Sequence, residues 1–305
     1  MRIVKSIFPF FCIFVFLIFH EVAILGAQKG LLLWYRTILP TLLPFIILTN
    51  LILNSDALEF IICFLSPLSK RLQINPYCMV CILIGLLCGY PIGGKIINDL
   101  YQKQKLSFEE SIHLLPVCNN ASPMFLVGYV HTFILKYQLP LFVLLSSVYL
   151  PQLIFYVIKN RKINYSYNYI VNNHHNSNPY ASLNTVLLHA IQIIVMIGCY
   201  IMLFSIGIEI IKHCIHSNML MILISYLEIT NGLSLLNTVC PVSLKYPLIL
   251  SLTTFGGFCS AYQVKSVLTC KEFKIKRYIL DKLSLSVCTF LLALLYQYVT
   301  LKIFV

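Results

Sequence analysis

The sequence predicts an all-α polytopic membrane protein, and three observations lead to that fold class. Hydrophobic residues make up 59% of the 305 residues. Charged residues make up 10% of the chain, against about 25% in soluble domains. Several apolar windows approach the roughly 20 residues that a helix needs to cross a bilayer. A soluble fold of this length could not bury so much apolar surface, whereas lipid tails solvate it.

The charge distribution points to the lipid bilayer as a partner and away from nucleic acid. The net charge is +12, from 22 basic and 10 acidic residues. The basic residues lie between apolar runs rather than in one patch, which is typical of cytoplasmic loops beside membrane spans. The densest basic segment, residues 271–282, is therefore expected to be a cytoplasmic loop before a last span at 283–305.

Residues 1–29 are expected to form an N-terminal transmembrane helix. Arg2 and Lys5 precede a long apolar run, as they would in a signal peptide. His20 and Glu21 stand where a cleaved signal would have small residues. The helix is therefore expected to remain uncleaved.

The remaining chain is expected to form two gate-like helical halves, residues 30–158 and 182–305. A polar loop at 159–181, rich in Asn, Ser and Tyr, separates them. His174 and His175 in this loop are a candidate metal pair, but no third ligand lies nearby. A solvated loop is the favoured interpretation, and neither a metal site nor a cofactor is expected.

Glycine-rich breaks interrupt an apolar run in each half. Segments 87–100 and 255–268 align without gaps, with Gly89 over Gly257 and Lys95 over Gln263. This alignment predicts an internal, inverted repeat, as in transporters whose substrate sites lie at broken helices near the bilayer midplane. The alternative is that the glycines only allow close helix packing. The candidate break residues are Gly89, Tyr90, Pro91, Gly93, Gly94, Gly232, Gly256 and Gly257.

Two polar stretches interrupt apolar runs and supply the candidate binding residues. The motif CNNASP at 118–123 would leave amide groups in lipid if it were helical, so a re-entrant or unwound segment facing a polar cavity is expected. Glu228 begins the motif EITNG, and an ionisable residue at membrane depth is by default a functional-site hypothesis. The alternatives are a structural network between helices and a carboxylate at the headgroups. The candidate solute-binding residues are Asn119, Asn120, Ser122, Glu228, Thr230, Asn231 and Gln263.

The other acidic residues are few and scattered. Glu209 lies one helical turn before His213 and is expected to pair with it or to face the interface. Asp281 is expected in a loop. The sequence contains no HExxH motif, nucleophile elbow or Walker loop, so an enzyme is not expected.

Five motifs in order resemble the YlbJ-type sporulation integral membrane proteins, within the wider nucleoside-recognition or gate domain families. The motifs are LPTLLPF (39–45), GYPIGGK (89–95), CNNASPMFLVG (118–128), LEITNG (227–232) and FGGFCSAYQ (255–263). The resemblance implies an all-helical inner-membrane protein with two gate-like halves. It also implies a role in endospore formation, particularly of the spore cortex, and a permease for an unidentified solute.

The sequence therefore predicts a multi-pass permease of the cell (cytoplasmic) membrane, with the mother-cell and forespore membranes as candidate locations. Its partners would be the bilayer, a small solute and a coupling ion, with Glu228 as candidate proton carrier. This hypothesis predicts that Asn119, Asn120, Glu228, Thr230 and Gln263 converge on one cavity. The alternative is a non-transporting scaffold for spore-envelope assembly, with dry, packed helix breaks. The oligomeric state is left open.

Overall fold

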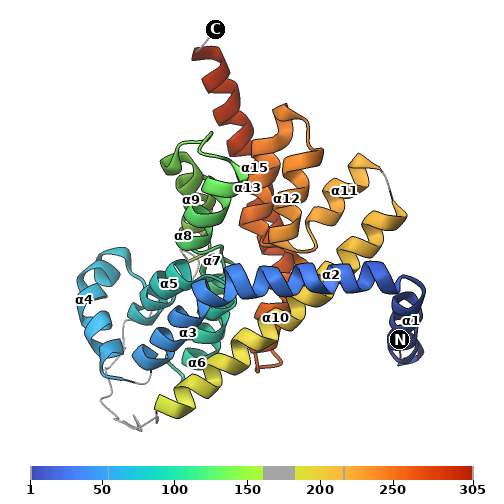
Figure 1. Ribbon diagram of the computed structural model, residues 1–305. Helices are drawn as coiled ribbons and strands as arrows, with labels where there is room; N and C mark the ends of the chain where they lie inside the picture. The colour runs from blue at the N-terminus through green and yellow to red at the C-terminus, as the bar shows by residue number, and fades with distance from the viewer. Residues whose placement is uncertain (1, 54, 161–182, 216, 304–305) are drawn as a thin grey trace.

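The computed structural model describes residues 2–53, 55–160, 183–215 and 217–303, and within these residues the fold is helical without strands (Figure 1). The expected inter-half loop with His174 and His175 lies almost wholly outside the described residues. In chain order the first elements are α1 (Arg2–Ile18), α2 (His20–Leu33), the π-helical segment η1 (Trp34–Ile38), α3 (Leu39–Leu53), α4 (Ala57–Leu72), α5 (Pro76–Cys88), α6 (Ile92–Gln102), α7 (Phe108–Cys118), α8 (Pro123–Phe125), the π-helical segment η2 (Leu126–Ile134) and α9 (Leu141–Asn160). They are followed by α10 (Leu183–Cys214), α11 (Asn218–Ser225), α12 (Ile229–Val239), α13 (Val242–Phe255), α14 (Gly257–Val267) and α15 (Ile275–Ile303).

Four helical stretches in the described residues are long and apolar enough to cross a membrane. They are His20–Leu53, Leu141–Asn160, Leu183–Cys214 and Ile275–Val299. Helices α4 and α5, which meet at a bend of 111°, add a fifth span if they count as one. Large apolar side chains such as Phe60, Phe64 and Phe142 face outward, where lipid would solvate them. The predicted all-α polytopic membrane fold is confirmed.

The N-terminal segment differs from the single helix expected at residues 1–29. The helix breaks at Phe19, whose φ of −106° and ψ of 39° are not helical, and α1 turns away from α2 there (Figure 1). Helix α2 then continues without interruption through η1 and α3 as far as Leu53. Pro40 explains the π-helical segment, because it has no N–H and its ring crowds the preceding turn. The wider turn, in which the Leu39 N–H donates to the Trp34 carbonyl, accommodates it.

Helices α2 and α10 cross at close range, as Figure 1 shows in blue and yellow. A Cβ added to Gly26 would lie 2.7 Å from the Ile206 Cα, so the two backbones nearly touch. The crossing also corrects the expected partner of Glu209. Its carboxylate pairs with Lys29 at 2.8 Å and with Lys212 at 3.0 Å rather than with His213, because α2 places Lys29 alongside.

Trp34→Phe is expected to lower the free energy of unfolding by about 1 kcal/mol, the usual net contribution of one hydrogen bond. The Trp34 indole Nε1 donates to the Ile194 carbonyl at 2.9 Å and so joins η1 to α10. Thermal unfolding of the purified protein in detergent measures the change. Tyr35→Phe is the matched control, because Tyr35 is exposed and next in the chain; an equal loss in both variants would contradict the assignment.

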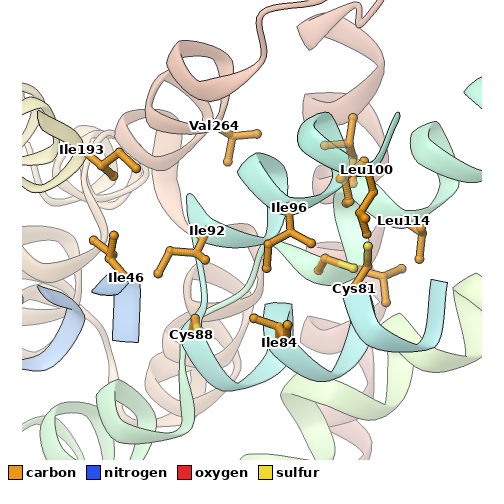
Figure 2. Close-up of a cluster of buried hydrophobic side chains, with 14 of the residues drawn as sticks. Ile46, Cys81, Ile84, Cys88, Ile92, Ile96, Leu100, Leu114, Ile193 and Val264 are labelled. Carbon is orange, nitrogen blue, oxygen red and sulfur yellow. The ribbon is translucent and has the colours of Figure 1, made fainter. Parts of the chain in front are cut away.

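The largest apolar core lies between the α5–α6 hairpin and its neighbours. Figure 2 shows Ile92, Ile96 and Leu100 of α6 facing Cys88, Ile84 and Cys81 of α5. The same core includes Ile46 of α3, Leu114 of α7, Ile193 of α10 and Val264 of α14. Helices α6 and α14 follow the two aligned glycine breaks, so this core joins the two halves of the chain.

Helix α15 begins at Ile275, eight residues before the last span expected from the sequence. Lys276, Arg277, Asp281 and Lys282 therefore belong to a helix rather than to a basic loop. Lys282 is 1% exposed and shares a buried face with Tyr278, Leu285, Ser286 and Thr289. That spacing of four, three, one and three residues follows the helical period. Lys282 is therefore buried because it falls on the buried face of α15, in spite of its charge.

Candidate functional site

Four interruptions between consecutive helices meet in the middle of the bundle. Break 1 is residues 89–91, between α5 and α6, and break 2 is residues 119–122, between α7 and α8. Break 3 is residues 226–228, between α11 and α12, and break 4 is Gly256, between α13 and α14. Each of the four breaks contains at least one of the candidate residues predicted from the sequence.

Backbone hydrogen bonds join the breaks in pairs. The Tyr90 N–H of break 1 donates to the Asn120 carbonyl of break 2 at 3.0 Å. The Phe258 and Cys259 N–H groups, just after break 4, donate to the Tyr226 and Leu227 carbonyls of break 3 at 2.9 and 2.8 Å. Backbone groups that the interrupted helices leave free are therefore paired with protein, as irregular backbone at membrane depth requires.

The two pairs also touch each other, and glycine makes the contact possible. Gly89 has φ of 77° and ψ of −168°, a conformation in which a side chain is strained, and a Cβ there would lie 2.7 Å from the Asn120 carbonyl oxygen. Gly256 has φ of 85°, and a Cβ there would lie 3.2 Å from the Tyr90 ring. Break 1 therefore packs on break 2 on one side and on break 4 on the other.

Side chains cap the helices that start directly after breaks 2 and 3, α8 and α12. Ser122 accepts a hydrogen bond from the Phe125 N–H, with Pro123 in the first helical position. Glu228 caps α12: Oε1 accepts from the Thr230 N–H at 3.0 Å and Oε2 from the Asn231 N–H at 2.8 Å. The Glu228 carboxylate, 2% exposed, therefore has a structural role in addition to any role in binding.

A pocket that is partly open to the exterior lies where the breaks meet. Residues of all four breaks line it, and η1, α3 and α10 complete the wall with Ile38, Thr41, Leu42, Ile197 and Ile201. Ile38 is the last residue of the π-helical segment η1 and Thr41 directly follows Pro40, so the distortion at Pro40 shapes this wall. The lining is mainly apolar with a small number of polar groups, as is usual in pockets for small molecules.

The structure brings most of the candidate binding residues to this pocket. Asn120, Ser122, Glu228, Thr230 and Gln263 line it, together with the break residues Gly89, Tyr90 and Gly256. The side-chain Oε1 of Gln263 accepts no hydrogen bond from the described residues, and the side-chain Nε2 donates to the Cys259 sulfur at 3.4 Å. The side chain, 5% exposed, therefore has a free acceptor at the pocket.

Asn119 and Asn231 are absent from the pocket lining. The Asn119 side chain accepts from the Gly94 N–H at 2.9 Å and donates to the Leu115 carbonyl at 2.8 Å. The Asn231 amide donates to the Ser205 hydroxyl of α10 at 2.8 Å. For these two residues the structure agrees with the alternative of a network that holds helices together.

The other predicted break residues, Pro91, Gly93, Gly94, Gly232 and Gly257, also lie outside the pocket lining. A Cβ added to Gly93 would overlap the Cys118 carbonyl group, and a Cβ added to Gly232 would overlap the Ser225 carbonyl group. These two glycines allow one helix to rest on the end of another, which is the packing alternative.

Lys282 is the residue at this site that the sequence analysis did not identify. Its Nζ donates to the Asn119 carbonyl at 2.9 Å and to the Asn120 Oδ1 at 2.7 Å, so α15 holds break 2 directly. Among the described residues, no carboxylate forms an ion pair with it. The periodicity of α15 was the signal that could have revealed it, since Lys282 falls in line with Tyr278, Leu285 and Thr289.

Comparison with known proteins gives one informative similarity. A stretch of 111 residues, 36% of the chain, is 31% identical to the sporulation integral membrane protein YlbJ of Bacillus subtilis (strain 168). The match spans only about a quarter of that protein, 27% of its length. The sequence matches no protein-family profile, and no solved structure matches the chain. The similarity and the apolar helices together support a multi-pass integral membrane protein.

Proposed function

We propose that this protein is a permease for a small polar solute, which binds in the pocket at the four helix breaks. The observation that carries the proposal is the convergence of four helix interruptions, from both halves of the chain, on one pocket whose mainly apolar lining includes a few polar groups. Interrupted helices at membrane depth are the usual construction of transporter binding sites. The proposal includes a coupling ion, with Glu228 as candidate proton carrier.

The similarity to a sporulation membrane protein supports the biological setting of the proposal. We infer a role in endospore formation, with the spore cortex as the process served and the mother-cell or forespore membrane as the location. The matched stretch is 36% of this chain. The inferred role rests on that stretch and on the five motifs that resemble those of the YlbJ-type proteins.

A panel of solutes tests the proposal through the melting temperature of the purified protein in detergent. Nucleosides and cortex precursors are included, and a solute at 100 times its dissociation constant should stabilise the fold by about 2.7 kcal/mol. Thr230→Val should abolish the shift, because Thr230 lines the pocket. Thr238→Val is the matched control on the same helix, since its exposed hydroxyl bonds only to the Leu235 carbonyl.

A non-transporting scaffold for spore-envelope assembly is the competing function. The side chains of Asn119 and Asn231 favour it, because both are used in contacts between and within helices. A well-folded sample that responds to no solute, with Thr230→Val indistinguishable from Thr238→Val in a spore-formation assay, would decide for the scaffold.

A further inference from the structure

We propose that the solute taken by this pocket carries a negative charge and that Lys282 selects it. The inference rests on the proposed function and adds the chemical class of the ligand. It starts from a buried lysine, placed one residue behind the pocket wall, that has no acidic partner in the described part of the chain.

Among the described residues, no acidic side chain would compensate a positive charge on Lys282. The side chain is 1% exposed, and both of its acceptors, the Asn119 carbonyl and the Asn120 Oδ1, are neutral. Transferring an unpaired ammonium group out of water is costly, so buried lysines normally have a carboxylate partner. A ligand that brings a negative charge would supply the missing partner.

Asn120 connects this charge to the pocket. Its Oδ1 accepts from Lys282 at 2.7 Å, its Nδ2 donates to the Val117 carbonyl at 2.5 Å, and the residue itself lines the pocket. Both ends of the amide are therefore fixed. Attraction between opposite charges is stronger in a site of low dielectric constant than in water, so the ammonium acts across this short distance.

The single carboxylate in the pocket lining does not cancel the effect of Lys282. Both oxygens of Glu228 accept backbone N–H groups at the start of α12, where the helix end carries a partial positive charge. Helices α6 and α14 also begin beside the pocket-lining residues Tyr90 and Gly256. Their N-terminal ends add partial positive charge of the same sign as Lys282.

The free polar groups of the pocket narrow the ligand class further. The side-chain Oε1 of Gln263 is available as an acceptor, so the solute should carry a hydroxyl or amino donor. The hydroxyl of Ser122, which accepts from the Phe125 N–H, remains able to donate. The pocket therefore fits a small organic anion that also bears a donor group.

Pairs of probes that differ only in charge test the inference on the wild-type protein. The pairs are lactate and lactamide, glucose 6-phosphate and glucose, and uridine monophosphate and uridine, with choline as a cationic probe. Melting temperatures are measured in about 0.15 M potassium chloride, which screens exposed charges beyond about 8 Å. For at least one pair, the anion should bind about tenfold or more tightly than its neutral partner, a difference of about 1.4 kcal/mol.

Substitutions then assign the effect to Lys282. Lys282→Met should lose the preference for the anion, and Lys282→Arg should keep it because the charge remains. Lys276→Met is the matched control on the same helix, since Lys276 is exposed, and it should leave the preference unchanged. If Lys282→Met does not fold, Lys282→Gln takes its place, because the glutamine amide can still donate hydrogen bonds but carries no charge.

Three results would overturn the inference. A neutral probe that binds as tightly as its anion, or choline binding in place of the anions, shows that the pocket does not select negative charge while the permease proposal stands. Anion preference that survives in Lys282→Met removes the role of this residue. A folded protein that responds to no probe of any charge rejects the pocket as a solute site, and the charge assignment with it.

Discussion

Gly93→Ala is expected to destabilise the protein by about 3 kcal/mol or more, at the upper end of the range for overpacked sites. A Cβ on Gly93 would lie 2.6 Å from the Cys118 carbonyl carbon and 3.0 Å from the Cys118 Cβ. Cys118 is the last residue of α7 and directly precedes break 2. The helix α6 or the end of α7 must therefore shift, and the pocket wall with it.

The intrinsic preference of a helix for alanine acts in the opposite direction. Alanine is favoured over glycine inside a helix by about 1 kcal/mol. Gly207 of α10 has no atom within 4 Å of its added Cβ. Gly207→Ala should therefore be neutral or stabilising, and the opposite signs at Gly93 and Gly207 separate the two effects.

The measurement is thermal unfolding of the two variants and the wild type in the same detergent. Gly232→Ala provides a second copy of the test in the other half, because its Cβ would lie 2.8 Å from the Ser225 carbonyl carbon. Equal small changes at Gly93, Gly207 and Gly232 would show that these helices have room to adjust. The glycines would then not be essential for the helix contacts.

These glycines also show how far the sequence could predict the site. Composition and apolar windows predicted the membrane fold, because lipid solvation depends on residue type alone. Asn and Ser residues inside an apolar run would leave polar groups in lipid if the run were helical, and this predicted the unwound segment at 119–122. Whether a glycine that permits a close contact also lines a pocket depends on the partner helices, and no local pattern in the sequence shows it. Gly89 and Gly93 belong to one motif and both permit close contacts, but only Gly89 lines the pocket.

Lys282 was misplaced for a related reason. Four basic residues between Lys271 and Arg277 made the segment resemble a loop, and the charge of Lys282 was counted with theirs. The helical period from Tyr278 to Thr289 outweighs that pattern because the apolar and small residues on this face pack against α13 and α9. A lysine is tolerated on such a buried helix face only where other segments supply hydrogen-bond acceptors. Break 2 supplies them to Lys282, and the sequence does not show this.

The internal repeat remains a prediction. The aligned segments do fold alike in outline, since α5 and α6 flank break 1 as α13 and α14 flank break 4. The two aligned segments, 87–100 and 255–268, are separated by a fixed number of residues. When break 2 is moved forward by that number, it falls inside α15, and when break 3 is moved back by the same number, it falls inside α4; both helices are continuous there. The correspondence seen in the sequence therefore covers one interruption of each half.

Glu228→Ala is expected to destabilise the protein by about 2–6 kcal/mol. The substitution leaves the Thr230 and Asn231 N–H groups without their acceptor, and each buried unsatisfied donor costs about 1–3 kcal/mol. Glu228→Gln should cost about half as much, because one amide oxygen replaces two carboxylate oxygens. Glu228→Asp should remain within about 1 kcal/mol of the wild type, since aspartate is a preferred residue at this position of a helix.

The same three variants separate the structural role of Glu228 from its candidate role as proton carrier. Proton coupling requires an ionisable group, so the pH dependence of solute uptake into proteoliposomes should survive in Glu228→Asp and disappear in Glu228→Gln. A capping role alone predicts that uptake follows stability and that its pH dependence is the same in both variants. Melting temperatures of the three variants place each on the stability scale. A Gln variant that is folded, active and still pH-dependent would reject Glu228 as the carrier and leave it as the cap of α12.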